Sequence, residues 1–311
     1  MFECKLKSKL FHNLIEVISS IIPDGSLVVG PNGISLSAIE ETRVGMIKVL
    51  LSKELCETYT CDKETELKID FQYMNNIVSR IKTGTIQLKY LESENKLQLK
   101  NKHKRTRTYI FSLLENIHCE SINSSLPSLD AQIVMDSKMF STALKDAAII
   151  GKEISFSAMK NGNFSISVYS EFGDLSIEFA EKISEPIYND IITKYDVEYL
   201  RKMTKSNILS QKVSINFGQD TPIILKYIID EETNSTIEYF LAPQVDEEEE
   251  GTEEEIEEET EEENLDDKTI NDEDNNIIPE DVLPKKDEEL EELEEEDLSE
   301  ELNEEDEYEN E

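Results

Sequence analysis

Residues 22–39 (IPDGSLVVGPNGISLSAI) and residues 150–168 (IGKEISFSAMKNGNFSISV) share one pattern, and this pattern decides the fold. Each stretch runs from a helix end into a strand, an Asn-Gly pair and a second strand with alternating apolar residues. Asn-Gly suits the positive φ angles of a two-residue β-hairpin turn. The sequence therefore predicts two equivalent hairpins, with their turns at Asn32-Gly33 and Asn161-Gly162.

Helical patterns recur around both hairpins. Apolar residues three or four apart predict a helix that buries one face. One such helix precedes each hairpin, and a second follows it and leads into further alternating strands. The helices before the hairpins have the apolar stripes Leu10, Leu14, Val17, Ile18 and Ile21 in the first copy and Phe140, Ala143, Leu144, Ala147 and Ala148 in the second. The helices after the hairpins have the stripes Met74, Ile77, Val78 and Ile81 in the first copy and Tyr199, Leu200 and Met203 in the second.

The repeat predicts an α+β body made of two copies of one unit, each with two helices and eight or nine strands. The predicted domains are residues 1–117 and 135–245. Residues 118–134 carry Ser, Asn and Pro and are typical of an exposed connector.

Most of the charge lies in the last 66 residues. The chain has a formal net charge of −39, and residues 246–311 hold 38 of its 70 acidic residues but only three of its 31 basic ones. This composition predicts a disordered tail. The remaining 245 residues are nearly neutral, so the overall acidity does not exclude a nucleic-acid partner.

Several classes of protein fit the sequence poorly. It has no run of 18 apolar residues, and its first residues do not match a signal peptide. The four cysteines lack zinc-site spacing and are predicted to be reduced thiols. We find no phosphate-binding glycine loop, metal-binding motif or nucleophile elbow in the body, so we expect no catalysis and no cofactor. The composition leaves an acidic-tailed chaperone or histone-binding protein as the alternative.

Five motifs, in order, resemble the proliferating cell nuclear antigen (PCNA) family of archaeal and eukaryotic DNA sliding clamps. They are MFE at 1–3, NGISLSAIEETRV at 32–44, TYTCD at 58–62, LPSL at 126–129 and EYFLAPQVDEE at 238–248. The resemblance covers about residues 1–248. It implies the DNA-clamp fold and a trimeric ring, homomeric or heteromeric, with sheets outside and helices around a central hole. The implied function is that of a polymerase processivity factor on duplex DNA.

The helix faces opposite the apolar stripes are expected to line that hole. Their basic residues are Lys9, His12, Arg80, Lys82, Lys138, Lys145, Arg201, Lys202 and Lys205. Scattered cations without a base-reading set suit phosphate contacts that ignore sequence. Asn13, Ser19, Asn76, Ser79 and Thr142 stand where relatives often have basic residues, so the hole is expected to be less positive than usual.

The resemblance also implies a hydrophobic pocket for partner proteins, under the connector. Its expected residues are Ile39, Val44, Leu126, Leu129, Pro222, Phe240, Ala242, Pro243 and Val245. Ligands would be short motifs that insert an aliphatic and two aromatic side chains. The partners implied are a DNA polymerase, a clamp loader, a flap endonuclease and a DNA ligase.

Subunits are expected to meet by pairing of edge strands, which leaves no free edge in the ring. One strand is 108–114, with Tyr109, Phe111 and Leu113 on one face. The other is 174–179, with Leu175, Ile177 and Phe179.

Two further features remain open in the sequence. Residues 100–107 (KNKHKRTR) form the densest basic run and are predicted to be a hairpin tip or a strand end. This run could contact DNA, act as a localisation signal, bind the acidic tail or be a solvated loop. Lys160 aligns with a lysine that eukaryotic relatives modify. The family resemblance implies a cytoplasmic protein at the nucleoid, or a nuclear one in a eukaryote.

Overall fold

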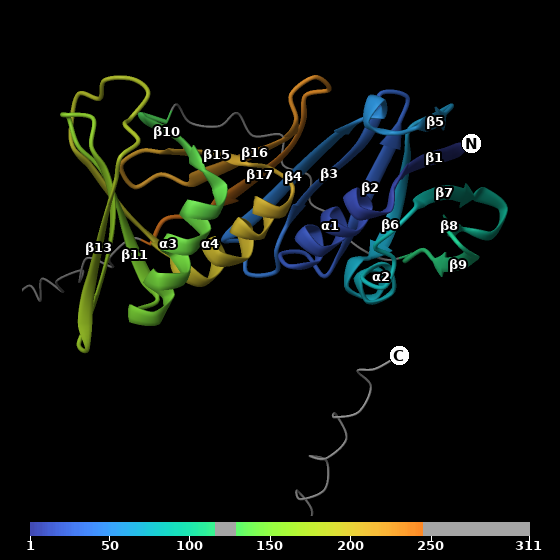
Figure 1. Cartoon of the computed structure of the whole chain (residues 1–311), viewed down its shortest axis with the longest axis horizontal. Helices are drawn as coiled ribbons and strands as arrows, with labels where there is room; N and C mark the ends of the chain where they lie inside the picture. Colours follow the sequence, from blue (N-terminus) through green and yellow to red (C-terminus); the bar gives the residue numbers. More distant parts are fainter. Residues whose placement is uncertain (116–128, 245–311) are drawn as a thin grey trace, which may run out of the picture. The chain divides into compact units, whose positions relative to one another are not determined.

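The computed structural model describes residues 1–115 and 129–244 (Figure 1). The first half contains β1 (Phe2–Lys7), α1 (Ser8–Ser19), β2 (Asp24–Gly30), β3 (Gly33–Ile39), β4 (Gly45–Ser52), β5 (Thr58–Cys61), β6 (Thr65–Asp70), α2 (Phe71–Val78), β7 (Thr85–Leu91), β8 (Lys96–Lys102) and β9 (Thr106–Ser112). The second half contains β10 (Ala131–Asp136), α3 (Ser137–Ile150), β11 (Glu153–Ala158), β12 (Phe164–Ser170), β13 (Gly173–Phe179), β14 (Ile191–Asp196), α4 (Val197–Met203), β15 (Lys212–Phe217), β16 (Ile223–Asp230) and β17 (Ser235–Leu241). Short 3₁₀ turns lie at Lys53–Leu55 (η1), Glu92–Glu94 (η2) and Thr204–Ile208 (η3).

The α+β class and the duplicated pattern are confirmed. In the part of the chain that the structure describes, each half has two α-helices, with nine strands in the first half and eight in the second. Most of the connector and the whole acidic tail lie outside the described residues, so the predictions about them remain predictions, as do the domain boundaries.

The two halves share one sheet. An eight-stranded antiparallel sheet has the order β10-β15-β16-β17-β4-β3-β2-β6, and β17 pairs with β4 from Thr236↔Leu50 to Leu241↔Gly45. A five-stranded sheet (β5-β1-β7-β8-β9) and a four-stranded sheet (β13-β12-β11-β14) complete the body. The sequence repeat predicted two units but not that they would join through a continuous sheet.

The four helices lie side by side in the order α3, α4, α1, α2 along the body (Figure 1). Most residues of their apolar stripes are buried as predicted, with Leu14, Ile18, Phe140 and Leu144 at most 3% exposed. Leu10, Ile77, Ala148 and Tyr199 are half-buried. Three helices start in the same way, because an aspartate ends the preceding strand and caps the helix. Asp70, Asp136 and Asp196 accept backbone N–H bonds from the first turns of α2, α3 and α4. Lys7 holds that position before α1 and makes no side-chain cap.

The hairpin prediction is right in outline and wrong in the turn. The two residues between β2 and β3 are Pro31 and Asn32, and Gly33 is already the first residue of β3, with φ of +151°. The second hairpin has a longer loop, 159–163, with Gly162 at φ of +85°. Gly33 is required by close approach, since a Cβ there would overlap the Leu51 carbonyl oxygen of β4.

Replacing Gly33 with Ala should therefore cost more stability than the backbone angle alone explains. Gly173 is a matched control, because its φ is +155° and a Cβ there would meet nothing within 4 Å. We expect Gly173→Ala to lower the free energy of unfolding by about 1–3 kcal/mol and Gly33→Ala by clearly more, since β4 must also move. Urea titration of the full chain measures both, and equal losses would contradict the overlap at Leu51.

Candidate functional site

The predicted DNA-contact residues lie on or next to the four helices. Lys9 and His12 are on α1, Lys138 and Lys145 on α3, Arg201 and Lys202 on α4, and Lys205 in η3. Arg80 and Lys82 lie just past the C-terminal end of α2, which closes at Val78, rather than within it. All are exposed except His12, which is half-buried, so their side chains are on the helix faces away from the sheet.

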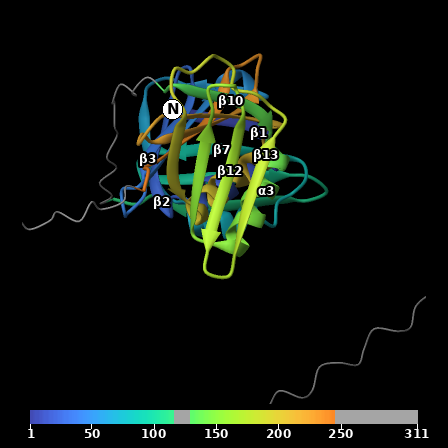
Figure 2. The same ribbon diagram turned by 90° about the vertical axis from the view of Figure 1, so that its left-hand side faces the viewer.

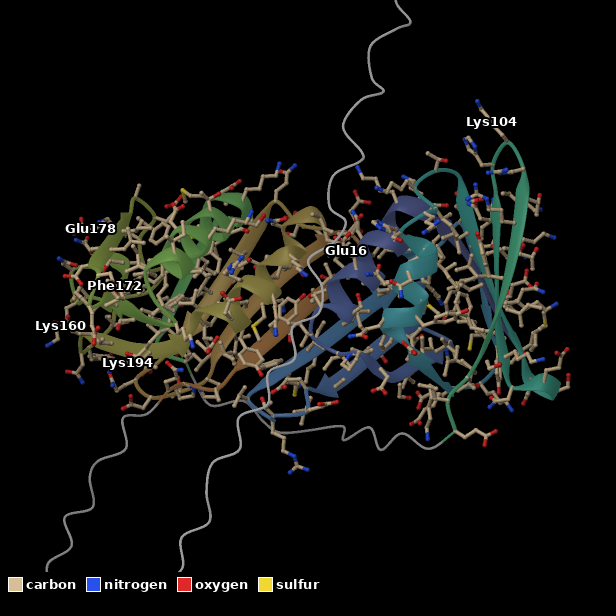
Figure 3. The ribbon with its side chains drawn as sticks, turned by 90° about the horizontal axis from the view of Figure 1, so that it is seen from below. Glu16, Lys104, Lys160, Phe172, Glu178 and Lys194 are labelled. Carbon is tan, nitrogen blue, oxygen red and sulfur yellow. The ribbon has the colours of Figure 1, made fainter. Side chains whose placement is uncertain are left out.

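The structure gathers four of these cations around one hollow. Lys145, Arg201, Lys202 and Lys205 line a depression of about 400 Å³ between α1, α3, α4 and η3, and Glu16 lies across from them. Figure 3 shows Glu16 near the middle of this helical surface. A neighbouring hollow of about 330 Å³ between α1, α2 and η3 includes both Glu16 and Lys205, so the polar surface continues across the two halves.

This surface mixes basic and acidic side chains, and some of the basic ones already have partners. Arg201 Nη1 lies 2.7 Å from the Glu198 carboxylate, and His12 Nε2 lies 3.9 Å from that of Glu16. Lys202 Nζ sits 5.0 Å from the centre of the Tyr199 ring. Ser19 and Asn76, which replace expected basic residues, line the second hollow. Such a surface would hold phosphate weakly, with contacts that are easily exchanged.

The opposite face of the eight-stranded sheet carries part of the predicted partner pocket. Ile39 and Phe240 both pair with Met46 of β4, from its two sides, and Ile224 pairs with Phe240. Residues opposite each other on adjacent strands project to the same face, so these four form one apolar row. Sequence reasoning named Ile39 and Phe240 but missed Met46 and Ile224, whose place depends on the strand register.

Val44, Pro222 and Ala242, three other predicted pocket residues, lie beside this row, just beyond the strand ends. The Val44 carbonyl accepts a 2.8 Å hydrogen bond from the Ala242 backbone, which joins the β3–β4 turn to the segment after β17. Pro222 precedes Ile223, which pairs with Leu241 next to Ala242. Pro222, Ala242, Pro243 and Leu129 are half-buried, and Val44 is 38% exposed. Leu126 and Val245 lie outside the described residues.

A larger depression lies beside this row and was not anticipated. It measures about 760 Å³, and its lining includes Ser37, Lys48, Leu50, Lys226 and Glu238. Lys226 and Glu238 form an ion pair of 2.8 Å, while Lys48 Nζ lies 5.0 Å from the centre of the Phe240 ring. The depression forms because β2 and β3 carry small serines where β4 and β16 carry longer side chains. Only the strand order shows that these strands lie together.

The turn that carries Val44 is organised by a buried carboxylate. Glu40 is 9% exposed and accepts hydrogen bonds from the backbone N–H groups of Thr42, Val44 and Gly45, and from the Thr42 hydroxyl. The Tyr199 hydroxyl of α4 lies 3.3 Å from the same carboxylate. Burial acts to raise the pKa of Glu40, but these hydrogen bonds outweigh it and leave the pKa below its ordinary value.

The two strands predicted to join subunits both lie at sheet edges in the single chain. β9 is the last strand of the five-stranded sheet and β13 the last of the four-stranded sheet. Figure 2 views the body from the end that carries β12 and β13. Tyr109, Leu175 and Ile177 are half-buried, whereas Phe111, Leu113 and Phe179 are at most 8% exposed and already belong to the core. Ile149 and Phe172, 81% and 98% exposed, lie on α3 and on the β12–β13 turn and were missed by sequence reasoning.

The basic run is a hairpin tip, one of the two predicted alternatives. β8 ends at Lys102, β9 starts at Thr106, and Lys104 projects from the turn between them (Figure 3). Lys160 is exposed in the β11–β12 loop, and its backbone N–H donates to Asp190.

Neither a metal site nor a disulfide emerges among residues 1–115 and 129–244. No group of three or more His, Cys, Asp or Glu in these ranges is placed to hold a metal ion. Cys4, Cys56 and Cys61 are free thiols, as predicted, while Cys119 lies outside the described residues. In the same ranges no helix is long and apolar enough to cross a bilayer.

Replacing Glu40 with Gln should loosen the Val44 turn. The ionised carboxylate is favoured in the folded state, so its contribution is present above the unfolded pKa, near 4.5, and lost as the pH falls through the lowered folded pKa. At pH 7 we expect Glu40→Gln to lower the free energy of unfolding by about 1–3 kcal/mol, a difference that shrinks below pH 4. Glu41→Gln, at an exposed neighbour, is the control in urea titrations across pH, and equal effects of the two changes would contradict this role.

Two family descriptions match the chain, and together they cover most of it. The PCNA N-terminal domain matches residues 1–121 and the PCNA C-terminal domain matches residues 126–244. A DNA polymerase sliding clamp of Pyrococcus horikoshii is 27% identical over 246 residues, which cover 77% of this chain and 96% of the relative. Proliferating cell nuclear antigen of Dictyostelium discoideum is 26% identical over 260 residues, covering 79% of this chain and 100% of the relative. The chain therefore belongs to the proliferating cell nuclear antigen family.

Proposed function

We propose that this protein is the subunit of a trimeric sliding clamp that encircles duplex DNA and holds replication and repair proteins on it. The observation that carries the proposal is the division of the body into two faces. One face bears four helices with exposed cations, and the other bears an apolar row and a depression on an open sheet. The relatives named as DNA polymerase sliding clamps and PCNA support the same function.

The helical face suits a duplex that must move. Its lysines and arginines are exposed, spread over α1, α3, α4 and η3, and mixed with polar and acidic side chains. Contacts of this kind go to phosphates, carry no sequence information and depend strongly on salt. A ring that relied on them would stay on DNA because it is closed and would slide because each contact is weak.

Ring closure would use the two sheet edges. Pairing β9 of one subunit with β13 of the next would join a five-stranded and a four-stranded sheet, and would satisfy backbone groups at both edges. The chain already contains a junction of this kind, since β4 and β17 join its two halves. The half-buried side chains Tyr109, Leu175 and Ile177 would then be covered by the neighbouring subunit.

In this proposal the protein itself performs no chemistry. The turn at Val44, the apolar row and Ala242 would receive the aliphatic and aromatic side chains of a partner's peptide motif. Candidate partners are a DNA polymerase, a clamp loader, a flap endonuclease and a DNA ligase. The protein would act wherever the genome is, in the cytoplasm or in the nucleus. The tail, with its large negative charge, would tune access to DNA and partners.

Placing a charge on an edge strand tests the ring. Ile177→Asp would bury an unpaired carboxylate at each β9–β13 junction, at a cost of several kcal/mol. We expect the wild-type chain to be a trimer and Ile177→Asp to be a monomer at micromolar concentration by light scattering. Leu50→Asp, on an internal strand and 54% exposed, should remain a trimer. A trimeric Ile177→Asp protein would remove β13 from the interface.

Truncating the pocket tests partner binding. We expect Val44→Ala combined with Leu129→Ala to weaken binding of a peptide with one aliphatic and two aromatic anchors at least tenfold, since about 1.4 kcal/mol of contact is lost. Leu50→Ala removes a similar side chain from the lining of the 760 Å³ depression. It is the matched comparison, and its affinity shows whether that depression contributes to peptide binding. Calorimetry measures the affinities, and light scattering checks that the ring remains. Unchanged affinity in the double variant would move the docking site elsewhere.

A further inference from the structure

The hairpin between β8 and β9 forms one wall of a strongly basic hollow. The other wall is the segment that follows α2, and the space between them is about 420 Å³. We name it the hairpin hollow. Its lining has five cations, Arg80, Lys82, Lys104, Arg105 and Arg107, together with His103. In the described lining no carboxylate offsets them, unlike the helical hollows, which contain Glu16.

Side-chain hydrogen bonds fix the two walls relative to each other. The side-chain amide nitrogen of Asn101, 4% exposed, lies 3.2 Å from Ser8 Oγ and from the carbonyl oxygens of Thr83 and Thr85, so its two N–H groups are shared among three acceptors. The guanidinium of Arg107 donates to the Arg80 carbonyl at 3.5 Å. The cations therefore converge on a base that is already organised without a ligand.

Close packing at Gly84 strengthens this base. Gly84 has φ of +84°, and a Cβ there would overlap the Lys102 carbonyl oxygen. Its own carbonyl accepts a 3.0 Å hydrogen bond from the Ser8 backbone at the start of α1. The segment that carries Arg80 and Lys82 is thus held against the strand that enters the hairpin, which leaves little freedom for the two walls to separate.

We propose that the hairpin hollow anchors phosphate groups of duplex DNA, which adds His103, Lys104, Arg105 and Arg107 to the DNA contacts at Arg80 and Lys82. This inference rests on the proposed clamp function and extends it. Three arginines offer planar, bidentate donors that match phosphate oxygens. Ile81 is the single apolar side chain in the described lining, so the hollow does not suit an apolar ligand. Arg80 and Lys82 follow α2 directly, which makes the hollow continuous with the proposed DNA surface.

The chemistry favours DNA over an acidic peptide. Each guanidinium can bind carboxylate or phosphate, but a duplex presents phosphates at regular, closely spaced positions that several cations engage together. The hollow provides such a set on a fixed base. It would give each subunit a stronger hold on the duplex than the partly neutralised helical face, and so would slow sliding or set the angle of the duplex.

The test uses the full chain and a short fluorescent duplex of random sequence. Lys104→Gln with Arg105→Gln removes two exposed cations at the tip and leaves Asn101 and Arg107 in place. Lys53→Gln with Lys160→Gln removes the same charge from exposed sites outside the hollow. Binding is followed by anisotropy over a salt titration. Because each lost phosphate contact lowers the slope of log Kd against log salt by about 0.9, we expect the hairpin variant to lose between about 1 and 2 units of slope.

The control variant should keep its slope within about half a unit. Equal losses in both variants would show a net-charge effect only, and no loss in the hairpin variant would equally overturn the proposal. A fluorescent peptide of residues 287–311 serves as the competing probe. If the hairpin change abolishes binding of this peptide and leaves the DNA slope unchanged, the hollow takes acidic peptide and not DNA.

Two further measurements distinguish a wrong assignment of the hairpin hollow from a wrong clamp function. Light scattering and stimulation of a DNA polymerase on primed circular DNA report on the ring. If the wild-type chain forms a trimer and stimulates the polymerase but the hairpin change leaves DNA affinity intact, the hollow alone is excluded. If the wild-type chain forms no ring, the clamp proposal itself fails.

Discussion

The pairing of β4 with β17 is the constraint on which the rest of the structure depends. These strands come from opposite halves, and their ladder from Thr236↔Leu50 to Leu241↔Gly45 turns two repeated units into one eight-stranded sheet. Backbone hydrogen bonds set the register, and the strand pleat then sends alternate residues to opposite faces. Ile47 and Tyr239 belong to the main core, whereas Met46 and Phe240 lie on the opposite face of the sheet, at 8% and 7% exposed. One ladder thus establishes both the helix-covered face and the apolar row.

The Glu40 network ties this junction to the partner surface. Its carboxylate satisfies three backbone N–H groups in the β3–β4 turn and approaches Tyr199 of the second half. A loop that presents an exposed Val44 would otherwise leave these donors without intramolecular partners. The buried charge is tolerated because several donors surround it, which is the usual condition for a buried carboxylate. Stability and the shape of the candidate docking site therefore depend on the same side chain.

Charge is distributed over the chain in a graded way. The tail carries most of the negative charge, and the helical face mixes cations with Glu16 and Glu198. The described lining of the hairpin hollow has cations and no carboxylate. An average over the whole sequence hides this gradient. Phosphate affinity scales with the number of cations engaged. In a protein proposed to slide, the weak contacts of the helical face would allow movement along DNA, and the concentrated contact in each subunit would hold the protein on it.

The sequence by itself determined the α+β class, the duplicated unit, the buried helix stripes and the family, because these depend on local periodicity and on motifs that are continuous along the chain. It also named Ile39, Val44, Phe240 and Ala242 as candidate pocket residues, because they stand in or beside such motifs. The tertiary structure alone decided that the halves share a sheet, that Met46 and Ile224 complete the apolar row, and that Arg80 and Lys82 meet the basic hairpin. It also placed the first hairpin turn at Pro31-Asn32, because Gly33 already pairs with Gly30 of β2 and with Ser52 of β4. Register and contact between distant segments arise from pairing across space, which no local pattern encodes.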